Sequence, residues 1–214
     1  MKPQQYLKRA DRVLAKIIAK VELKERKSHK RYFESFCVAI INQQLSTKAA
    51  ATIVKRFIEL FDQPRNAKDR PKRSRRAKHT KFPMPADVLK KSDVQLRKAG
   101  LSFQKISYIK SLAKLIEQGS IDFIKFKKMT DEEIIISLTE VKGIGRWTAE
   151  MFLMSCLNRP DVFSHGDLGL KNAIKKLYKL DLISQPKKYH RLVESWSPHR
   201  TAAARYLWAS LNLK

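Results

Sequence analysis

The chain has 214 residues and carries 46 Lys and Arg against 20 Asp and Glu, a formal net charge of +26. Its hydrophobic content of 43% indicates a packed body beneath that charge, either one domain or two small lobes sharing a cleft. No apolar run approaches the ~20 residues of a spanning helix, and the N-terminus lacks the apolar core of a signal peptide. We therefore expect a soluble, intracellular protein with no membrane partner, whose ligand is a polyanion, nucleic acid first.

Only two cysteines are present, Cys37 and Cys156, far apart and in apolar contexts. This argues against a disulfide framework. Two thiolates are also too few for a zinc knuckle or a four-cysteine iron–sulfur cluster. We expect no metal site and no cofactor of that kind.

Apolar residues recur at helical spacing nearly everywhere, beginning with an N-terminal helix over about residues 1–28. With six glycines in the chain and no sustained alternating segment, a sheet has little support, so the predicted fold class is all-α. Helix starts are predicted at Ser46 and at Ser102, with Gly119 ending the second of these helices. Thr130, with Glu133 three residues later, predicts a capping box.

One segment breaks the helical pattern. Residues 62–85, DQPRNAKDRPKRSRRAKHTKFPMP, are rich in Arg, Lys and Pro and nearly free of apolar residues. We interpret them as a mobile basic loop that adds non-specific affinity for phosphate. A solvated linker or a localisation signal is the alternative.

Two glycines, Gly143 and Gly145, stand in VKGIGRWTAEM directly before a predicted helix. A dinucleotide fingerprint needs a preceding strand and a third glycine, but a helix precedes this pair and Thr148 takes the third place. Glycine allows positive φ and close approach of a surface. The amides of Gly143, Gly145 and Arg146 are then expected to point outward at the positive end of the second helix, where an anion binds. A glycine cap joining two packed helices is the alternative.

The segment from Leu138 to Ala149 resembles the helix-hairpin-helix motif that grips a DNA backbone phosphate. After the second helix, about residues 147–157, Asp167 opens another helical pattern 20 positions beyond Trp147. Together these features resemble the helix-hairpin-helix (HhH-GPD) DNA glycosylases, in particular the 3-methyladenine DNA glycosylase II branch. The resemblance extends through IINQQLSTKAA, FPMPADVLKKSDVQLRKAGLSFQKISYIKSLA and WSPHRTAAARYLW, so it covers most of the chain from about residue 30.

The resemblance implies one glycosylase domain over residues 1–214, with two helical lobes and a cleft between them. About residues 30–130 form one lobe, and about 131–214 with the N-terminal helix 1–28 form the other. It implies a monomeric base excision repair enzyme that binds damaged double-stranded DNA and hydrolytically excises alkylated purines, such as 3-methyladenine and 7-methylguanine, leaving an abasic site. Such a protein lies with DNA, in the bacterial cytoplasm and nucleoid or in a nucleus. The hairpin carbonyls leave room for a monovalent cation.

Asp167 is the candidate catalytic residue. Cleaving the bond to an electron-poor base leaves positive charge on the sugar. A fixed carboxylate beside the sugar stabilises this charge or orients the attacking water. The alternative, an ordinary helix N-cap, is compatible with this role. Asp161 and Asp181 are weaker candidates, and His165 is assigned no catalytic role.

The bifunctional glycosylase/lyases of the family carry a nucleophilic Lys two residues beyond the second glycine. This chain has Trp147 there, so no amine stands at that position to form a Schiff base, and a monofunctional enzyme is predicted. The expected phosphate contacts are Lys142, Gly143, Gly145, Arg146, Thr148 and Lys171.

Alkylated purines carry positive charge on the ring, so an electron-rich aromatic wall attracts them over normal bases. Trp147 is one expected wall. Trp208, at the position of a pocket tryptophan in the family, is the second, with Phe33 and Tyr32 as further candidates. Core packing is the alternative for Trp208 and the expected role of Trp196.

Excision requires the nucleotide to be flipped out and the gap to be filled. The loop NQQLS takes this role in the family: Gln44 matches the wedge position, with Gln43 and Leu45 beside it. The alternative is a helix start capped by Ser46 with solvated glutamines. Two other functions stay open: a non-catalytic helix-hairpin-helix nucleic-acid-binding module, and a glycosylase for another lesion such as uracil or hypoxanthine.

Overall fold

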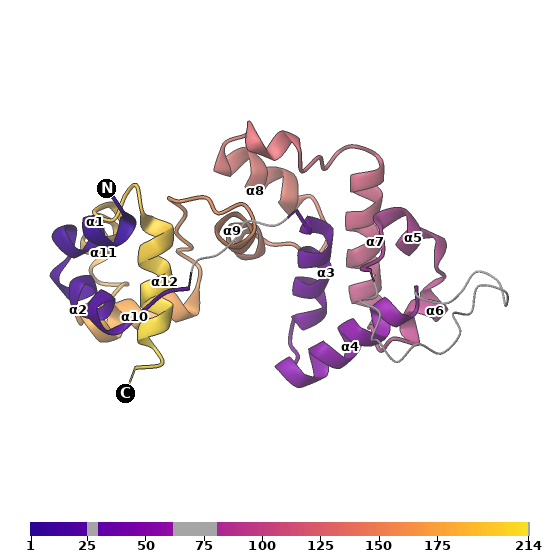
Figure 1. The fold of residues 1–214 in the computed structure, drawn as a ribbon, viewed down its shortest axis with the longest axis horizontal. Helices are drawn as coiled ribbons and strands as arrows, with labels where there is room; N and C mark the ends of the chain where they lie inside the picture. Colours follow the sequence, from indigo (N-terminus) through magenta and orange to yellow (C-terminus); the bar gives the residue numbers. More distant parts are fainter. Residues whose placement is uncertain (25–29, 62–80, 214) are drawn as a thin grey trace. The chain divides into compact units, whose positions relative to one another are not determined.

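The computed structural model describes residues 1–24, 30–61 and 81–213, and all regular secondary structure in these ranges is helical (Figure 1). The predicted all-α fold class is confirmed. In chain order the helices are α1 (Pro3–Ala10), α2 (Arg12–Lys20), α3 (Tyr32–Asn42), α4 (Thr47–Glu59), α5 (Pro85–Lys90), α6 (Asp93–Arg97), α7 (Phe103–Glu117), the 3-10 helix η2 (Lys125–Lys127), α8 (Asp131–Thr139), α9 (Arg146–Ser155), α10 (Leu168–Tyr178), α11 (Pro186–Glu194) and α12 (Arg200–Ser210).

The chain divides into two compact units. The first unit comprises Met1–Lys30 and Arg146–Lys214, and the second comprises Arg31–Gly145. The division therefore falls inside the glycine hairpin, between α8 and α9. Residues 131–145, which we expected in the C-terminal lobe, belong in the structure with α3–α7.

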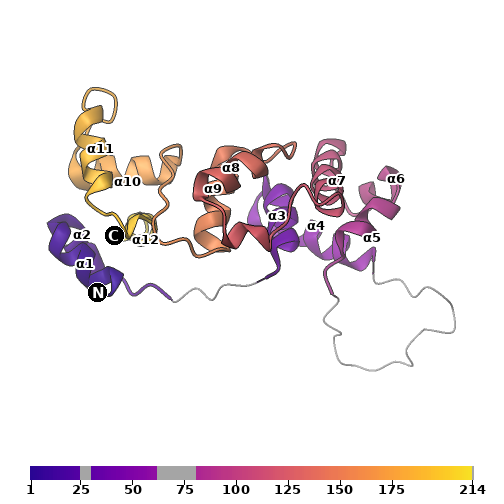
Figure 2. The ribbon, with the colours of Figure 1, turned by 90° about the horizontal axis from the view of Figure 1, so that it is seen from above.

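In the first unit, α12 packs against α1, α2 and α10 (Figures 1 and 2). The single N-terminal helix expected over residues 1–28 is wrong, because α1 and α2 are separate helices and residues 21–24 are not helical. Asp11 causes the break. It adopts an extended conformation, with φ −144° and ψ 110°, and its carboxylate accepts hydrogen bonds from the amides of Val13 and Leu14 at 2.8 and 2.9 Å. It thereby caps α2 and ends α1.

The same carboxylate joins the two ends of the chain. Asp11 is buried, and its Oδ2 accepts hydrogen bonds from Trp196 Nε1 at 2.8 Å and from Tyr178 Oη at 2.6 Å. Burial, together with this bond, raises the pKa of Tyr178 well above its usual range. Trp196 is fully buried, so its expected architectural role is confirmed. The N-terminal helices are thus fixed to the part of the unit that carries α10 and α11.

In the second unit, α7 lies against α3, α5 and α6. The predicted N-caps Ser46, Ser102 and Thr130 are confirmed, and Thr130 forms a capping box with Glu133. Gly119, with φ +75°, follows the end of α7 as predicted. The core of this unit is formed by residues such as Cys37, Ile40, Phe57, Leu96, Ile106 and Ile109.

Most of the predicted basic loop, residues 62–80, lies outside the described residues. Its expected C-terminal end is wrong, because residues 82–85 belong to the folded body. The ring of Phe82 lies 5.7 Å from that of Phe57 and 6.2 Å from that of Phe33, and Pro83 and Pro85 are buried. An aromatic side chain followed by two prolines supplies apolar surface that packs before α5 begins.

Candidate active site

Asp167 occupies the N-cap of α10, as the sequence predicts. Its Oδ1 accepts a hydrogen bond from the amide of Leu170 at 2.8 Å, which satisfies one of the unpaired donors at the helix start. Only 8% of the residue is exposed. The carboxylate is therefore held in one orientation by the helix that it caps.

Two indoles donate hydrogen bonds to this carboxylate. Trp147, in the first turn of α9, donates from Nε1 to Asp167 Oδ2 at 2.7 Å. Trp208, near the end of α12, donates from Nε1 to Asp167 Oδ1 at 2.9 Å. Three residues expected at the site are thus brought together by three different helices of the first unit. Trp147 is 52% exposed, so much of its surface stays open to a ligand.

Gly169 makes room for this arrangement. A Cβ at this position would lie 3.1 Å from Asp167 Oδ1 and 3.2 Å from Trp208 Cδ1, closer than most side chains approach. The missing side chain lets the indole reach the carboxylate. Sequence reasoning missed this residue, although a glycine in the first turn of a predicted helix is a usable signal.

The pKa of Asp167 reflects opposing effects. Burial raises it, but hydrogen bonds from Trp208, Trp147 and the amides of Leu170 and Gly169 favour the charged form. These donors outweigh burial, and the pKa lies below the ordinary value of 3.8. The site therefore presents an ionised, oriented carboxylate at neutral pH.

A buried glutamate supports the same region. Glu150, in α9, is 6% exposed and accepts hydrogen bonds from Arg146 Nε at 3.1 Å and from Ser164 Oγ at 2.6 Å. It ties the first turn of α9, which carries Trp147, to the segment that leads into Asp167. Arg146, expected at a phosphate, thus has its Nε directed to Glu150. Sequence reasoning missed Glu150, whose signal is its spacing of four residues from Arg146 on one helix.

The weaker carboxylate candidates have structural partners. Asp161 accepts hydrogen bonds from Arg200 Nε and Nη2, each at 2.9 Å, and from Ser197 Oγ at 2.8 Å. Asp181 is exposed and accepts a hydrogen bond from its near neighbour Ser184. His165 Nδ1 lies 2.8 Å from Tyr189 Oη.

Tyr32 and Phe33, the other expected pocket aromatics, lie in the first turn of α3 and so in the second unit. Their ring centroids lie 5.1 Å from that of Phe123 and 6.2 Å from that of Phe82, respectively. Each ring therefore contributes to the aromatic packing of that unit.

The hairpin glycines differ from each other. Gly143 has φ +83°, and a Cβ there would collide with the ring of Tyr108. Gly145 does not have positive φ, and a Cβ there would meet no atom within 4 Å. The expected positive φ is thus confirmed at Gly143 alone, while Gly145 faces open space. Of the other expected phosphate contacts, Lys142 is exposed, and Thr148 and Lys171 are half-buried.

The loop between α3 and α4 lies against this hairpin. Gln43 ends α3, and its Nε2 donates a hydrogen bond to the carbonyl of Gly143 at 3.1 Å. Gln44 adopts a left-handed conformation with φ +56°, and Leu45 is 39% exposed. Of the three candidate wedge residues, Gln43 is directed to the hairpin carbonyl and the other two are exposed.

Lys105, in α7, also contacts this loop and was missed from the sequence. Its Nζ donates hydrogen bonds to the carbonyls of Ile41 and Gln43 at 2.7 and 2.9 Å. Desolvation by burial lowers the pKa of Lys105. A lysine in a strongly basic chain gives no sequence signal for such a role.

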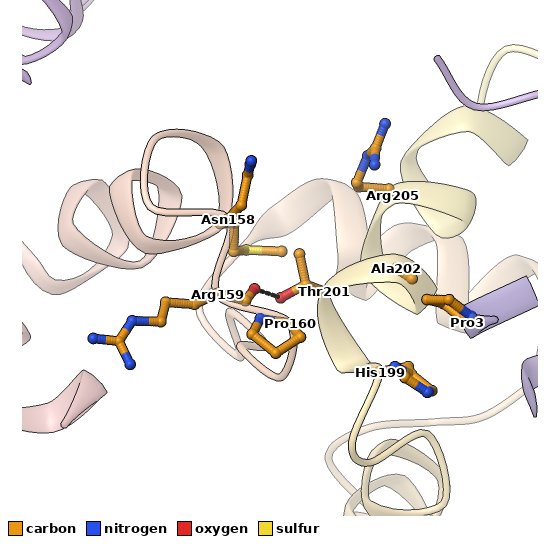
Figure 3. Close-up of a pocket in the computed structure, with 9 residues that line it drawn as sticks. Pro3, Asn158, Arg159, Pro160, His199, Thr201, Ala202 and Arg205 are labelled. Atoms are coloured by element: carbon orange, nitrogen blue, oxygen red, sulfur yellow. Dashed lines mark hydrogen bonds between the residues drawn. The ribbon is translucent and has the colours of Figure 1, made fainter. Parts of the chain in front are cut away.

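A pocket of about 230 Å³ lies elsewhere in the first unit (Figure 3). It is lined by the segment 158–160 and by Thr201, Ala202 and Arg205 of the N-terminal half of α12. The hydroxyl of Thr201 donates a hydrogen bond to the carbonyl of Arg159. The guanidinium group of Arg159 points away from Thr201 (Figure 3). Trp208, which donates a hydrogen bond to Asp167, lies in the other half of α12. Neither Trp208 nor Asp167 lines this pocket, so it is separate from the carboxylate site.

Within the described parts of the chain, no group of three His, Cys, Asp or Glu side chains is arranged to hold a metal ion. None of the helices described has the length and apolar character needed to cross a bilayer.

Comparison with known proteins gives consistent matches. Residues 37–199 match the sequence model described as HhH-GPD superfamily base excision DNA repair protein. DNA-3-methyladenine glycosylase 1 of Schizosaccharomyces pombe is 32% identical over 201 residues, covering 94% of this chain and 81% of that protein. A DNA-3-methyladenine glycosidase of Bacillus halodurans has TM-score 0.81 and 31% identity, covering 100% of this chain and 90% of that one. The 3-methyladenine DNA glycosylase Mag1 of S. pombe, in complex with abasic DNA, has TM-score 0.75 and 30% identity, covering 100% and 98%.

Proposed function

The chain belongs to the HhH-GPD superfamily of base excision DNA repair proteins, and from this membership we propose that it is a monofunctional DNA glycosylase that excises alkylated purines from double-stranded DNA. The observation that carries this proposal is the buried Asp167 carboxylate held between the indoles of Trp147 and Trp208. A family member that only bound DNA would need the hairpin, but no such carboxylate.

Hydrolysis breaks the bond between C1′ of the deoxyribose and the base nitrogen, and the electron pair leaves with the base. Positive charge then develops on the sugar. Asp167 stabilises that charge and directs the water that attacks C1′. Because the donors around it keep the pKa of Asp167 low, the carboxylate is ionised before the substrate arrives. Such preorganisation avoids reorientation of solvent during the reaction.

A lesion with positive ring charge suits this site. The face of an indole attracts a cation, so the exposed ring of Trp147 favours a 3-methyladenine or 7-methylguanine type of base over a neutral one. The names of relatives such as DNA-3-methyladenine glycosylase 1 support the same substrate class. We propose Trp208 as the second aromatic wall, since its indole is fixed to the same carboxylate.

Trp147 also favours hydrolysis over lyase chemistry. It stands two residues beyond Gly145, where a lyase would carry its nucleophilic amine. With an indole donating to Asp167 from that position, no amine attacks C1′ and the DNA strand stays uncut.

In the second unit, the proposed phosphate contacts are the backbone of Gly143 and Gly145 and the side chain of Lys142. In the first unit, they are the side chains of Thr148 and Lys171. We propose that a monovalent cation binds the hairpin carbonyls. The carbonyls of Val141 and Gly143 accept hydrogen bonds from Ile144 N and Gln43 Nε2, and a carbonyl has a second lone pair with which to bind a cation. We propose no iron–sulfur cluster, since the two cysteines of the chain are fewer than the four thiolates that such a cluster uses. We propose Gln44 and Leu45 as the wedge, and a monomer as the active form.

Release of bases from methylated duplex DNA tests the proposal. We expect free 3-methyladenine and 7-methylguanine, with strand cleavage only after alkali. Cleavage before alkali would mean that the enzyme is a lyase. DNA binding without base release would mean that the chain is a binding module, and release of uracil or hypoxanthine alone would mean a different lesion class.

A further inference from the structure

Within the second unit, the loop that carries the wedge candidates is joined to Gly143, the first glycine of the proposed phosphate-binding hairpin. Gln43 Nε2 donates a hydrogen bond to the carbonyl of Gly143 at 3.1 Å, across 100 positions of sequence. One helix, α7, contacts both partners: Lys105 bonds to the loop, and Tyr108 packs against Gly143. Loop, hairpin and α7 are therefore each joined to the other two.

Lys105 is the centre of this arrangement. Its ammonium donates to the carbonyls of Ile41 and Gln43 at 2.7 and 2.9 Å, where the last carbonyls of α3 have no partner within the helix. A cation at a helix C-terminus also interacts favourably with the helix dipole. The side chain is half-buried, so these charge-assisted bonds are stronger than exposed ones. Its charge is directed to the protein backbone.

The hydrogen bonds of Lys105 hold the backbone next to Gln44, which has an uncommon conformation. A left-handed conformation, here φ +56°, is unfavourable for a residue with a side chain and persists only where its surroundings enforce it. Lys105 fixes the carbonyl of Gln43 directly before it, and Leu45 N donates to Asn42 O at 3.2 Å directly after it. The tip of the loop is thereby set in an outward-facing conformation before DNA binds.

The hairpin side of the contact is equally constrained. The ring of Tyr108 occupies the space that a side chain at Gly143 would need, and Gln104 Nε2 donates to Tyr108 Oη at 2.8 Å. Gly143 therefore cannot move toward α7 without displacing that ring.

We propose that Lys105 is a positioning residue that holds the loop 43–45 in register with the phosphate-binding hairpin, so that gripping the backbone places the wedge at the neighbouring base pair. This inference rests on the proposed glycosylase function. Lys105 acts through Gln43 and Gln44 and touches no reacting atom.

The test is single-turnover excision of 7-methylguanine from a duplex by Lys105→Met, which keeps an unbranched side chain but removes the ammonium group and its charge. Misplacing the wedge is expected to slow excision about tenfold. Affinity for undamaged duplex, which the proposal does not assign to the wedge, is expected to stay close to that of wild type. Lys105→Arg, which keeps the positive charge and can donate to both carbonyls, is expected to restore most of the rate. Lys114→Met is the matched control, since it removes the same charge from an exposed position of α7.

A double-variant cycle separates positioning from a general effect on folding. If Lys105 acts through the wedge, adding Lys105→Met to Gln44→Ala/Leu45→Ala slows excision no further, whereas independent effects multiply. A multiplied loss would overturn the proposal, as would a wild-type rate in Lys105→Met or in Gln44→Ala/Leu45→Ala. If Lys105→Met does not fold, Gln43→Leu removes only the bond to Gly143 and is expected to show the same tenfold loss. Absence of excision by the wild-type protein would instead contradict the proposed function.

Discussion

Asp167 combines three roles in one side chain. It caps α10, it orients two indoles, and it supplies the charge proposed for the reaction. A buried carboxylate without donors would be expected to have a raised pKa, so the indole and amide N–H groups decide its charge state. The amide of Leu170, which Asp167 caps, is one of these donors. Capping α10 therefore helps to keep the carboxylate charged, and the two roles of Asp167 are compatible.

The lowered pKa of Asp167 predicts how the protein depends on pH. A carboxylate with a lower pKa in the folded state contributes stability that is present above its unfolded value and lost as pH falls through the folded value. The pKa of Asp167 in the folded protein lies below 3.8, so its carboxylate should stay ionised between about pH 5 and pH 8. The rate of excision should therefore show no loss from protonation of Asp167 in this range. Single-turnover rates across that range measure it. A decline toward pH 5 that Asp167 titration explains would contradict the assigned environment.

At the scale of single residues, the sequence predicts a role where neighbouring residues in the chain indicate it. Asp167 is visible as a helix start, and Trp147 by its place after the glycines. Gly169 and Lys105 are not visible in the same way, because their importance comes from atoms far away in the sequence. Local spacing also cannot show that the amide of Gln43 reaches Gly143.

Among the helices and turns, the hairpin glycines allow a matched pair of substitutions. Gly143→Ala places a side chain at φ +83° and against Tyr108, and should lower the free energy of unfolding by at least about 1 kcal/mol. Gly145→Ala meets open space, so it should leave stability unchanged but weaken DNA binding, because its Cβ would meet the phosphate. Thermal unfolding and duplex affinity measure the two effects. If Gly145→Ala binds DNA as tightly as wild type, the hairpin glycines would only connect two packed helices and would not bind phosphate.

The N-terminal helices allow a second prediction of this kind. Asp11→Ala removes the cap of α2 and leaves the polar groups of Trp196 and Tyr178 without their partner. Together these losses should cost about 3 kcal/mol of unfolding free energy, measured by chemical denaturation. Asp181→Ala, which removes an exposed carboxylate, is the control and should cost less than about 0.5 kcal/mol. Equal effects of the two variants would contradict the anchoring role of Asp11.

Helix starts were predictable because Ser46, Ser102 and Thr130 act on their own first turns. The break at Asp11 was not recognised, since apolar periodicity continues through both α1 and α2.

For the molecule as a whole, periodicity and charge predicted an all-α protein that binds a polyanion. They did not predict that the hairpin itself is where the two units divide, because that depends on which helices each side packs with. Charge also does not identify individual phosphate contacts. Lys105 binds backbone carbonyls, and Arg146 Nε binds Glu150.

The net charge of +26 predicts that DNA affinity falls steeply with salt, with a log–log slope of about −0.9 per phosphate contacted. Replacing residues 62–80 with a neutral Ser/Gly segment of equal length should make the slope shallower by about 0.9 for each phosphate that the protein no longer neutralises. Excision at saturating enzyme should stay unchanged. An unaltered slope would mean that the basic tract does not contact DNA.

The proposed mechanism requires that the carboxylate of Asp167 drives excision while the rest of the protein binds the DNA. Asp167→Asn keeps an acceptor for α10 but loses the charge, and Asp181→Asn is the charge-matched control. In single-turnover assays with methylated duplex, we expect Asp167→Asn to slow base release at least about 100-fold. Its affinity for abasic DNA should stay close to that of wild type. Base release at a normal rate, or loss of excision together with binding and folding, would contradict this mechanism.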